Sequence, residues 1–270
     1  MRLVLVLLVL VGACFASGVQ AAPRSVYLED LTWTELRDAL KAGVTTVIIP
    51  AGGTEQSGPH MALGKHNARA RMLAGRIAAE LGDTLVAPVI AYVPEGSISP
   101  PTEHMRFPGT LSVPDPVFKG TVEAAARSLR QAGFTQIVLI GDHGGYQNLL
   151  KAAAAELNRE WAGTAVRAHF VDDYYKITQT GYVQALRAKG LSDAQIGSHA
   201  GAADTSLLMA VDPSMVRADR LDGAQSPANG PANGTAGDPR PSTAALGQLG
   251  VDLIVAQTVA AIRKARTEKR

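Results

Sequence analysis

The chain has a single cysteine, Cys14, among 270 residues, and only 5% of its residues are aromatic. One cysteine cannot form an intramolecular disulfide, which excludes a disulfide-stapled scaffold. Neither sign of charge dominates, with 26 Lys and Arg against 24 Asp and Glu, and the basic residues are scattered. Nucleic acid is therefore not an expected partner. After the N-terminal region we expect no stretch near the ~20 apolar residues of a membrane span.

The N-terminus has the pattern of an export signal. A short basic start, Met1-Arg2, precedes an apolar run at residues 3–11, and Val19-Gln20-Ala21 offers small residues for cleavage. We expect residues 1–21 to be a signal peptide, which places the mature protein in the periplasm. Alternatively, residues 11–14 resemble a lipoprotein box, and the protein would then be anchored by a lipid on Cys14.

Residues 22–270 are expected to form a single α/β domain, because they suffice for one large core. Buried strands are predicted at residues 45–50, 84–93, 135–140 and 165–171. Helices are predicted at residues 32–43 with a Thr32/Glu35 capping box, from an Asn67 N-cap to 82, and at 115–133, 145–163, 176–189, 203–211 and 244–264. This alternation favours a three-layer α/β/α sandwich with a mainly parallel sheet. Residues 221–241, rich in Gly, Pro and Asn, are expected to be a long surface loop.

Polar side chains follow two of the predicted strands. Glu55, His60 and His66 lie after the first, and Asp142 with His143 after the third. Because loops at the carboxyl ends of parallel strands share one edge of the sheet, these residues are candidate ligands of a metal such as zinc. Alternatively they are structural, capping turns or helix starts. Phosphate binding at residues 141–145 is disfavoured because no Lys-Ser/Thr follows.

The motifs along the chain resemble those of the creatininase (creatinine amidohydrolase) family. They are residues 54–60 (Thr-Glu-Gln-Ser-Gly-Pro-His), 63–64 (Leu-Gly), 107–110 (Phe-Pro-Gly-Thr), 142–145 (Asp-His-Gly-Gly), 199–201 (His-Ala-Gly) with 205–206 (Thr-Ser), and 237–239 (Gly-Asp-Pro). The resemblance implies an α/β/α sandwich, a homo-oligomer, commonly a hexamer, and a two-metal centre. In the family this centre generates hydroxide that attacks a cyclic amide or a similar C–N bond.

The resemblance implies a first metal site at Glu55, His66 and His143, where the family has Asp in place of His66. The family's second metal site would fall on Ser57, His66 and Gly145. These residues cannot hold a second ion, because a neutral imidazole has one lone pair and cannot bridge two ions. We therefore predict one divalent metal, with zinc ahead of manganese or iron. Its ligands would be Glu55, His66 and His143, with Asp204 as fourth ligand or as base.

Other family positions suggest further roles. His199 is predicted to be catalytic as a proton shuttle, because an imidazole titrates near neutral pH. His60 and His104 are expected to structure their loops. Asp142 and Glu103 are candidates for carboxylates that orient a ligand imidazole.

The predicted function is that of an exported metal-dependent amidohydrolase acting on a small cyclic amide or related C–N bond through an activated water. The alternative is an altered family member that binds a metal or a small molecule without hydrolysis. Retention of a donor at His66 favours a working site. Creatinine itself is not the expected substrate, because its turnover in the family depends on two metals.

Overall fold

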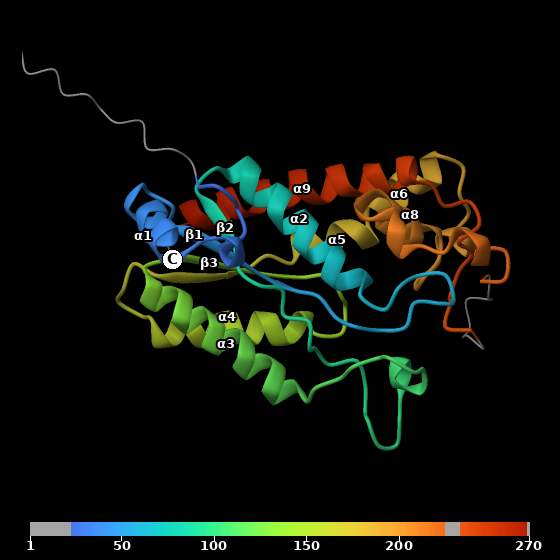
Figure 1. Cartoon of the computed structure of the whole chain (residues 1–270), viewed down its shortest axis with the longest axis horizontal. Helices are drawn as coiled ribbons and strands as arrows, with labels where there is room; N and C mark the ends of the chain where they lie inside the picture. The colour runs from blue at the N-terminus through green and yellow to red at the C-terminus, as the bar shows by residue number, and fades with distance from the viewer. Residues whose placement is uncertain (1–22, 225–232, 269–270) are drawn as a thin grey trace, which may run out of the picture.

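The computed structural model describes residues 23–224 and 233–268 (Figure 1). The predicted signal peptide and Cys14 lie outside the described residues, as does part of the predicted long loop. Export and lipid anchoring therefore stay predictions.

Within the described residues, a four-stranded sheet has the order β2-β1-β3-β4, with all neighbours parallel. The strands are β1 (Thr46–Ala51), β2 (Thr84–Val86), β3 (Gln136–Gly141) and β4 (Arg167–Phe170). In the central pair, Thr46 is aligned with Gln136 and Ala51 with Gly141. Both central strands are buried almost throughout, as expected for a parallel sheet covered on both faces.

Helices cover the two faces of this sheet (Figure 1). One layer contains α3 (Asp115–Ala132) and α4 (Gln147–Glu160). The other contains α2 (Lys65–Leu81), α5 (Asp173–Gln179), α6 (Gly181–Ala188), α8 (Ala202–Val211) and α9 (Ala244–Thr267). The shorter elements are α1 (Trp33–Lys41), α7 (Asp193–Ile196) and the 3-10 segments η1 (Leu28–Asp30), η2 (Glu103–Arg106), η3 (Pro213–Met215) and η4 (Ala218–Arg220). The predicted α/β sandwich is confirmed.

Alternate residues of β1 point into different layers of the core. Val47 and Ile49 belong to the cluster that includes Phe118 of α3. Ile48 belongs to the opposite cluster, which includes Leu73 of α2. This period of two is the side-chain geometry of a strand, and here both faces bury apolar residues.

The predicted capping box of α1 and the predicted range of α3 are confirmed. Thr32 and Glu35 form the capping box, in which the Glu35 carboxylate accepts the Thr32 N–H at 2.7 Å. α3 starts at Asp115 with Pro116 in its first turn. It stops at Gly133, whose φ of 119° is readily adopted by glycine.

The start of α2 differs from the prediction. Gly64, rather than Asn67, is the N-cap residue. Asn67 instead lies in the first turn, where its side chain accepts the Gly53 N–H at 3.0 Å and donates to Thr54 at 3.1 Å. Asn67 thus fastens the loop after β1 to α2, and His66 belongs to the helix rather than to the loop.

Predicted elements at residues 84–93 and 176–189 are also interrupted. β2 ends at Val86, and Pro88 follows, which cannot donate to a ladder. The extended chain beyond it keeps only a bridge between Ile90 and Ala51. The helix predicted at 176–189 is divided into α5 and α6 at Thr180, whose φ and ψ of −121° and −87° are not helical.

We expected no later segment with the length and composition of a membrane span, but α9 is such a segment. α9 has 24 residues and is apolar enough to cross a membrane. However, it packs against α8, α5 and α2 in the structure. It also buries Val251, Ile254, Val259 and Ile262 in the core. These are the contacts of a core helix.

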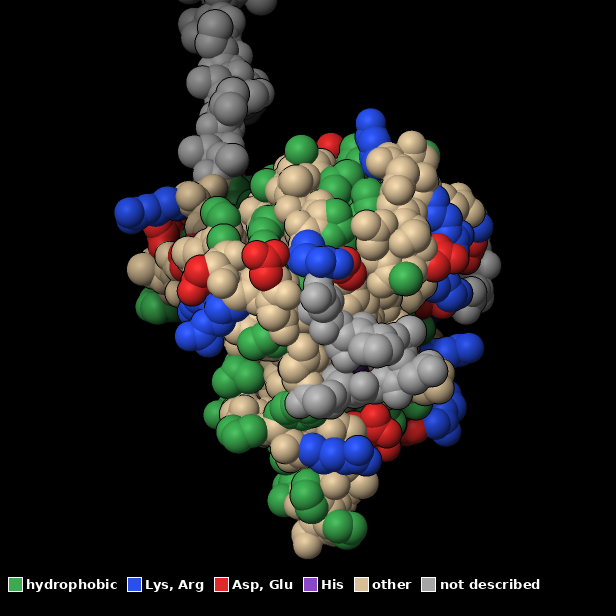
Figure 2. Space-filling model, turned by 90° about the vertical axis from the view of Figure 1, so that its right-hand side faces the viewer, with side chains coloured by type: hydrophobic (Ala, Val, Ile, Leu, Met, Phe, Trp, Pro, Cys, Tyr) green, Lys and Arg blue, Asp and Glu red, His purple; other side chains and the backbone are tan. Residues whose placement is uncertain are grey.

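Charged side chains of both signs are mixed on the face of the molecule drawn in Figure 2. Lys and Arg side chains there are interspersed with Asp and Glu, and they form no continuous stripe on that face. The distribution agrees with the scattering seen along the sequence.

Candidate metal centre

The loops that follow β1 and β3 leave the same edge of the sheet and are joined by Tyr146. Its hydroxyl group lies 2.9 Å from the carbonyl oxygen of Ala51 and 2.6 Å from that of Gly52, where it can donate. The same oxygen accepts the backbone N–H groups of Asp142 and His143, at 3.2 and 3.1 Å. One buried hydroxyl therefore sets the relative position of the two loops that carry candidate site residues.

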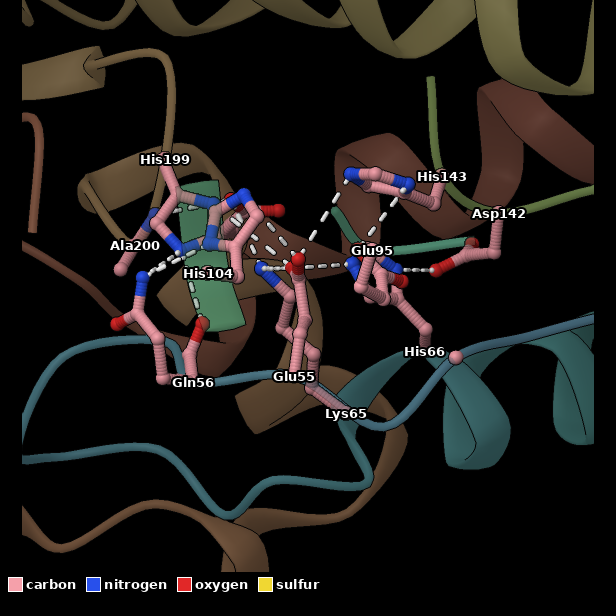
Figure 3. A network of polar contacts seen from close by, with 12 residues as sticks. Glu55, Gln56, Lys65, His66, Glu95, His104, Asp142, His143, His199 and Ala200 are labelled. Atoms are coloured by element: carbon pink, nitrogen blue, oxygen red, sulfur yellow. Dashed lines mark hydrogen bonds and ion pairs between the residues drawn. The ribbon is translucent and has the colours of Figure 1, made fainter. Parts of the chain in front are cut away.

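Among the described residues, four side chains of metal-binding type meet beyond these loops (Figure 3). They are Glu55, Glu95, His104 and His143, and one ligand atom of each lies within 4.8 Å of the others. Glu55 follows β1 and His143 follows β3. Glu95 and His104 come from the long segment between Val93 and α3.

Three buried carboxylate oxygens in this group have no hydrogen-bond partner among the described residues: Oε2 of Glu55 and both oxygens of Glu95. Oε2 of Glu55 lies 3.4 Å from Nε2 of His104 and 3.7 Å from Nε2 of His143. Oε2 of Glu95 lies 3.6 Å from Nδ1 of His143. Burying such oxygens without partners is costly, whereas two carboxylates and two imidazoles are ordinary ligands of a divalent ion. The donor set therefore fits a metal.

The electrostatics of the group also favour a cation. Burial, followed by the negative charge of Glu55, raises the pKa of Glu95 to about 9. Burial lowers the pKa of His143 to about 4, although Glu55 opposes the shift. A neutral imidazole is the form that binds metals, and a positive ion beside Glu95 would favour its carboxylate.

The other oxygen of Glu55 is already engaged by the protein. Oε1 lies 2.8 Å from Nε2 of His66 and 3.2 Å from Nζ of Lys65. Burial alone would raise the pKa of Glu55, but Lys65 and His66 hold it well below its usual value. Glu55 is thus a carboxylate with one oxygen paired to side chains and the other facing the candidate ligands.

His66, a predicted ligand, contacts carboxylates through both ring nitrogens. Nδ1 is 2.6 Å from Oδ2 of Asp142, and Nε2 faces Glu55. Asp142, one of the expected orienting carboxylates, also accepts the Tyr174 hydroxyl at 2.9 Å. To bind an ion directly, His66 would have to give up one of these contacts. Its role as a ligand stays a prediction.

Asp204, the predicted fourth ligand or base, is paired with two cations. Oδ1 accepts from Arg69 at 2.7 Å, and Oδ2 lies 3.5 Å from Nζ of Lys65. The backbone N–H of Ala200 also donates to Oδ2, at 3.0 Å. Lys65 and Arg69 outweigh the effect of burial and hold the pKa of Asp204 well below its usual value. Asp204 therefore contacts the cations of α2 rather than the group of Glu55, Glu95, His104 and His143.

His199, the predicted proton shuttle, lies against His104, with ring centroids 4.6 Å apart. Its Nε2 can donate to the Gln56 carbonyl at 3.0 Å, which leaves Nδ1 as the acceptor, 3.8 Å from Oε1 of Glu55. Burial and the charge of Lys65 lower the pKa of His199 to about 3. The imidazole is therefore neutral at neutral pH, and the premise that it titrates near the working pH does not hold in this environment. The shuttle role stays a prediction.

The backbone beside both of these imidazoles is strained. Glu103, which precedes His104, has a φ of 48°, and Ala200, which follows His199, has a φ of 56°. Non-glycine residues rarely adopt positive φ, and they keep it only where the surroundings hold them there. Such strain is typical of functional sites, and here it occurs directly beside two imidazoles.

An inner and an outer cavity meet at these imidazoles. The inner cavity, of about 210 Å³, is lined by polar side chains that include Glu55, Lys65, Arg69, His143, Tyr175 and Asp204. The outer cavity, of about 430 Å³, is lined by Gln56, Glu103, Arg106, Phe107 and Ala236. His104 and His199 line both. The inner cavity offers a small polar space beside the candidate metal ligands.

Two histidines expected to structure their loops have different positions. His60 is fully buried, and its Nε2 lies 2.9 Å from Oγ1 of Thr205, outside the candidate metal group. His104, in contrast, belongs to that group. Glu103, the other expected orienting carboxylate, lines the outer cavity.

Glu95, Lys65 and Arg69 were not predicted from the sequence. Glu95 lies in a Pro/Gly/Ser-rich segment with no periodic pattern, so nothing indicates where its side chain points. Lys65 and Arg69 are one helical turn apart and therefore share a face of α2. A predicted helix start at Lys65, rather than at Asn67, would have placed both side chains on one face of the helix.

Comparison with known proteins identifies the family. Residues 29–262 match the Creatininase family model, described as creatinine amidohydrolase. The chain therefore belongs to the creatininase family, as its motifs indicated. This membership supports metal-dependent hydrolysis of a C–N bond as its class of activity.

Individual relatives agree with this assignment. Creatinine amidohydrolase from Pseudomonas putida is 28% identical over 260 residues, covering 89% of this chain and 97% of the relative. The mycofactocin precursor peptide peptidase of Mycolicibacterium smegmatis is 30% identical over 187 residues, covering 67% and 64%. A tryptophan-to-alanine mutant creatininase has a TM-score of 0.74 at 26% identity, covering 91% of this chain and 100% of its own. A glutamate-to-glutamine mutant creatininase described as Zn-Zn type has a TM-score of 0.71 at 25% identity, with the same coverage.

Proposed function

We propose that this protein is a metal-dependent amidohydrolase that cleaves a C–N bond in a small cyclic amide or a related compound. One divalent ion, zinc in the first place, would be held by Glu55, Glu95, His104 and His143. The observation that carries the proposal is the set of buried carboxylate oxygens without hydrogen-bond partners, directly beside two imidazoles and a cavity. Membership of the creatininase family supports the same chemistry.

A divalent ion bound there would polarise a carbonyl group and lower the pKa of a bound water towards ~7. The protein's own part is to place and move protons. We propose His199 as the residue that relays a proton to the leaving nitrogen through Nδ1, although burial and the charge of Lys65 make this imidazole a weak base with a pKa of about 3. Ala200, directly after His199, has a positive φ, and its N–H donates to Asp204. Lys65 and Arg69 keep Asp204 ionised beside it.

The size of the inner cavity, about 210 Å³, favours a small substrate. Its polar lining suits a compact polar ring better than an apolar ligand. The relative from M. smegmatis is a peptidase by name, so peptides are the competing substrate class. A peptide would have to extend past His104 and His199 towards Arg106 and Phe107 in the outer cavity.

A substrate screen tests this proposal. Purified protein loaded with zinc or manganese would be assayed against lactams, hydantoins, formamides and short peptides. The Glu95→Gln variant should lose both the ion and the activity, because it removes a charged ligand. Glu156→Gln, on the exposed face of α4, is the matched control and should keep both.

Hydrolysis of cyclic amides by the wild type and by Glu156→Gln, but not by Glu95→Gln, would support the proposal. Cleavage of peptides alone would contradict the substrate class. Stable binding of the metal with no hydrolysis of any compound would favour the non-hydrolytic alternative.

We also propose that the protein is exported to the periplasm, on the strength of its N-terminal sequence. A mature protein that begins at Ala22 in the periplasmic fraction would support cleavage by an ordinary signal peptidase. A lipid-modified Cys14 in the membrane fraction would support the anchored alternative. A homo-oligomer, commonly a hexamer in this family, is proposed on the resemblance and is tested by light scattering on the purified protein.

A further inference from the structure

The ammonium group of Lys65 is buried beside the carboxylate of Glu55 (Figure 3). Nζ is 3.2 Å from Oε1 of Glu55 and 3.5 Å from Oδ2 of Asp204. Nδ1 of His199 is 3.8 Å from the same Glu55 oxygen. Lys65 is only 1% exposed, so its charge is neutralised by these neighbours rather than by water.

The carboxylate of Glu55 divides the site into two sides. Oε1 faces Lys65 and His66, while Oε2 faces His104 and His143 and has no hydrogen-bond partner among the described residues. The Oε1 side therefore already contains a cation supplied by the chain. The Oε2 side instead contains carboxylate oxygens of Glu55 and Glu95 that have no hydrogen-bond partner among the described residues.

Arg69 strengthens the positive charge on the Oε1 side. It lies one helical turn after Lys65, donates to Oδ1 of Asp204 at 2.7 Å and places Nε 3.0 Å from Oδ2 of Asp142. A divalent ion on this side would have to lie within a few ångströms of the Lys65 ammonium. In a buried environment the repulsion between two such charges is large.

We propose that Lys65 is an internal cation that keeps a second divalent ion away from the Oε1 side of Glu55, so that the site holds one divalent ion on the Oε2 side. Lys65 is a positioning residue in this arrangement. It fixes Oε1 of Glu55, and Oε2 is thereby directed at Glu95, His104 and His143. The inference rests on the proposed metal centre.

Metal stoichiometry tests the inference. Metal-free full-length mature protein would be reconstituted with zinc and desalted, and bound zinc would be counted by elemental analysis. We expect one equivalent in the wild type and two in Lys65→Met, because Glu55, Asp204 and His199 lose the ammonium between them. Lys65→Arg, which keeps the charge, should bind one equivalent. Lys176→Met, the same change on the exposed surface of α5, should also bind one.

Two equivalents in the wild type, or one in a folded Lys65→Met protein, would overturn the inference while leaving the metal centre intact. No zinc in the wild type would overturn the metal centre itself and the inference with it. Since Lys65→Met could fail to fold, electron paramagnetic resonance of the manganese-loaded wild type is a second measurement. An isolated Mn²⁺ spectrum supports a single ion, and a spin-coupled pair contradicts it.

Discussion

Nδ1 of His66 lies 2.6 Å from Oδ2 of Asp142 in the interior of the protein, and neither side chain is more than 5% exposed. The same Asp142 oxygen lies 3.0 Å from Nε of Arg69. Asp142 thus holds two residues of α2 in position from the loop after β3. Because one of these residues contacts Glu55, the position of the candidate metal ligand depends on a carboxylate in a different loop.

The Asp142→Asn variant should be strongly destabilised. It leaves the buried Arg69 guanidinium and His66 without their shared carboxylate, and breaking a buried pair of this kind costs roughly 3–5 kcal/mol. Urea unfolding of the metal-free protein measures the loss. Asp193→Asn, which removes an exposed pair with Arg187, is the control and should leave the free energy of unfolding nearly unchanged. Equal effects of the two variants would show that Asp142 has no such role.

The Glu95→Gln variant should stabilise the metal-free protein while removing its metal. The pKa of Glu95 is raised from 4.5 to about 9 in the folded state, so the folded protein binds the extra proton. The stability that this proton provides is complete below about pH 4.5 and is lost as the pH rises through about 9. At pH 7 the free energy of unfolding of the wild type is therefore lower by roughly 3 kcal/mol at most, and the neutral side chain of glutamine would restore this amount.

Thermal unfolding of both metal-free proteins at pH 5, 7 and 9 checks this prediction. The advantage of Glu95→Gln should grow with pH. An advantage that is constant across the pH range would contradict the raised pKa.

Acid should destabilise the metal-free protein through its buried histidines. Burial, and then the charge of Lys65, lower the pKa of His60 from 6.5 to about 4. The stability present above about pH 6.5 is therefore lost as the pH falls through about 4, because the unfolded chain binds the proton first. This contribution amounts to roughly 3 kcal/mol. His60→Gln, whose amide can still reach Thr205, should show a shallower loss in urea titrations between pH 7 and 4. Parallel profiles for the two proteins would refute the assignment.

Two histidine variants distinguish the ligands predicted from the sequence from the group found in the structure. His104→Ala removes a member of the candidate metal group and should abolish tight zinc binding. His66→Ala removes a residue that orients Glu55 and should weaken binding by about 10–100-fold. Isothermal titration with zinc compares them, and His60→Gln, outside the group, should bind as the wild type does. The opposite order would place His66 among the direct ligands.

The fold was predictable from the sequence because local signals and the hydrophobic pattern agree. The continuous apolar runs that became β1 and β3 predicted a parallel sheet covered on both faces, and Thr32 and Glu35 marked the start of α1 correctly. The start of α2 was misplaced because the side chain of Asn67 has a better partner in Gly53 than in its own helix. That competing contact depends on the tertiary structure.

The candidate site was only partly predictable. Glu55 and His143 lie in the loops that follow β1 and β3, so their neighbourhood could be inferred from sheet topology. Glu95 and His104 reach the site from a segment with no period, and its course depends on packing rather than on propensity. The pairing of Asp204 with Lys65 and Arg69 joins α8 to α2, a contact between helices far apart in the chain that no local pattern encodes.

The position of α9 has a consequence for biosynthesis. Val251, Ile254, Val259 and Ile262 complete the apolar layer that Leu73 of α2 also occupies. A nascent chain that has not yet delivered residues 244–267 leaves this layer open to water. During translation, that side of the sheet therefore cannot be covered until α9 has been synthesised. A nascent chain on a ribosome stalled before residue 244 should expose apolar surface that chaperones and proteases bind.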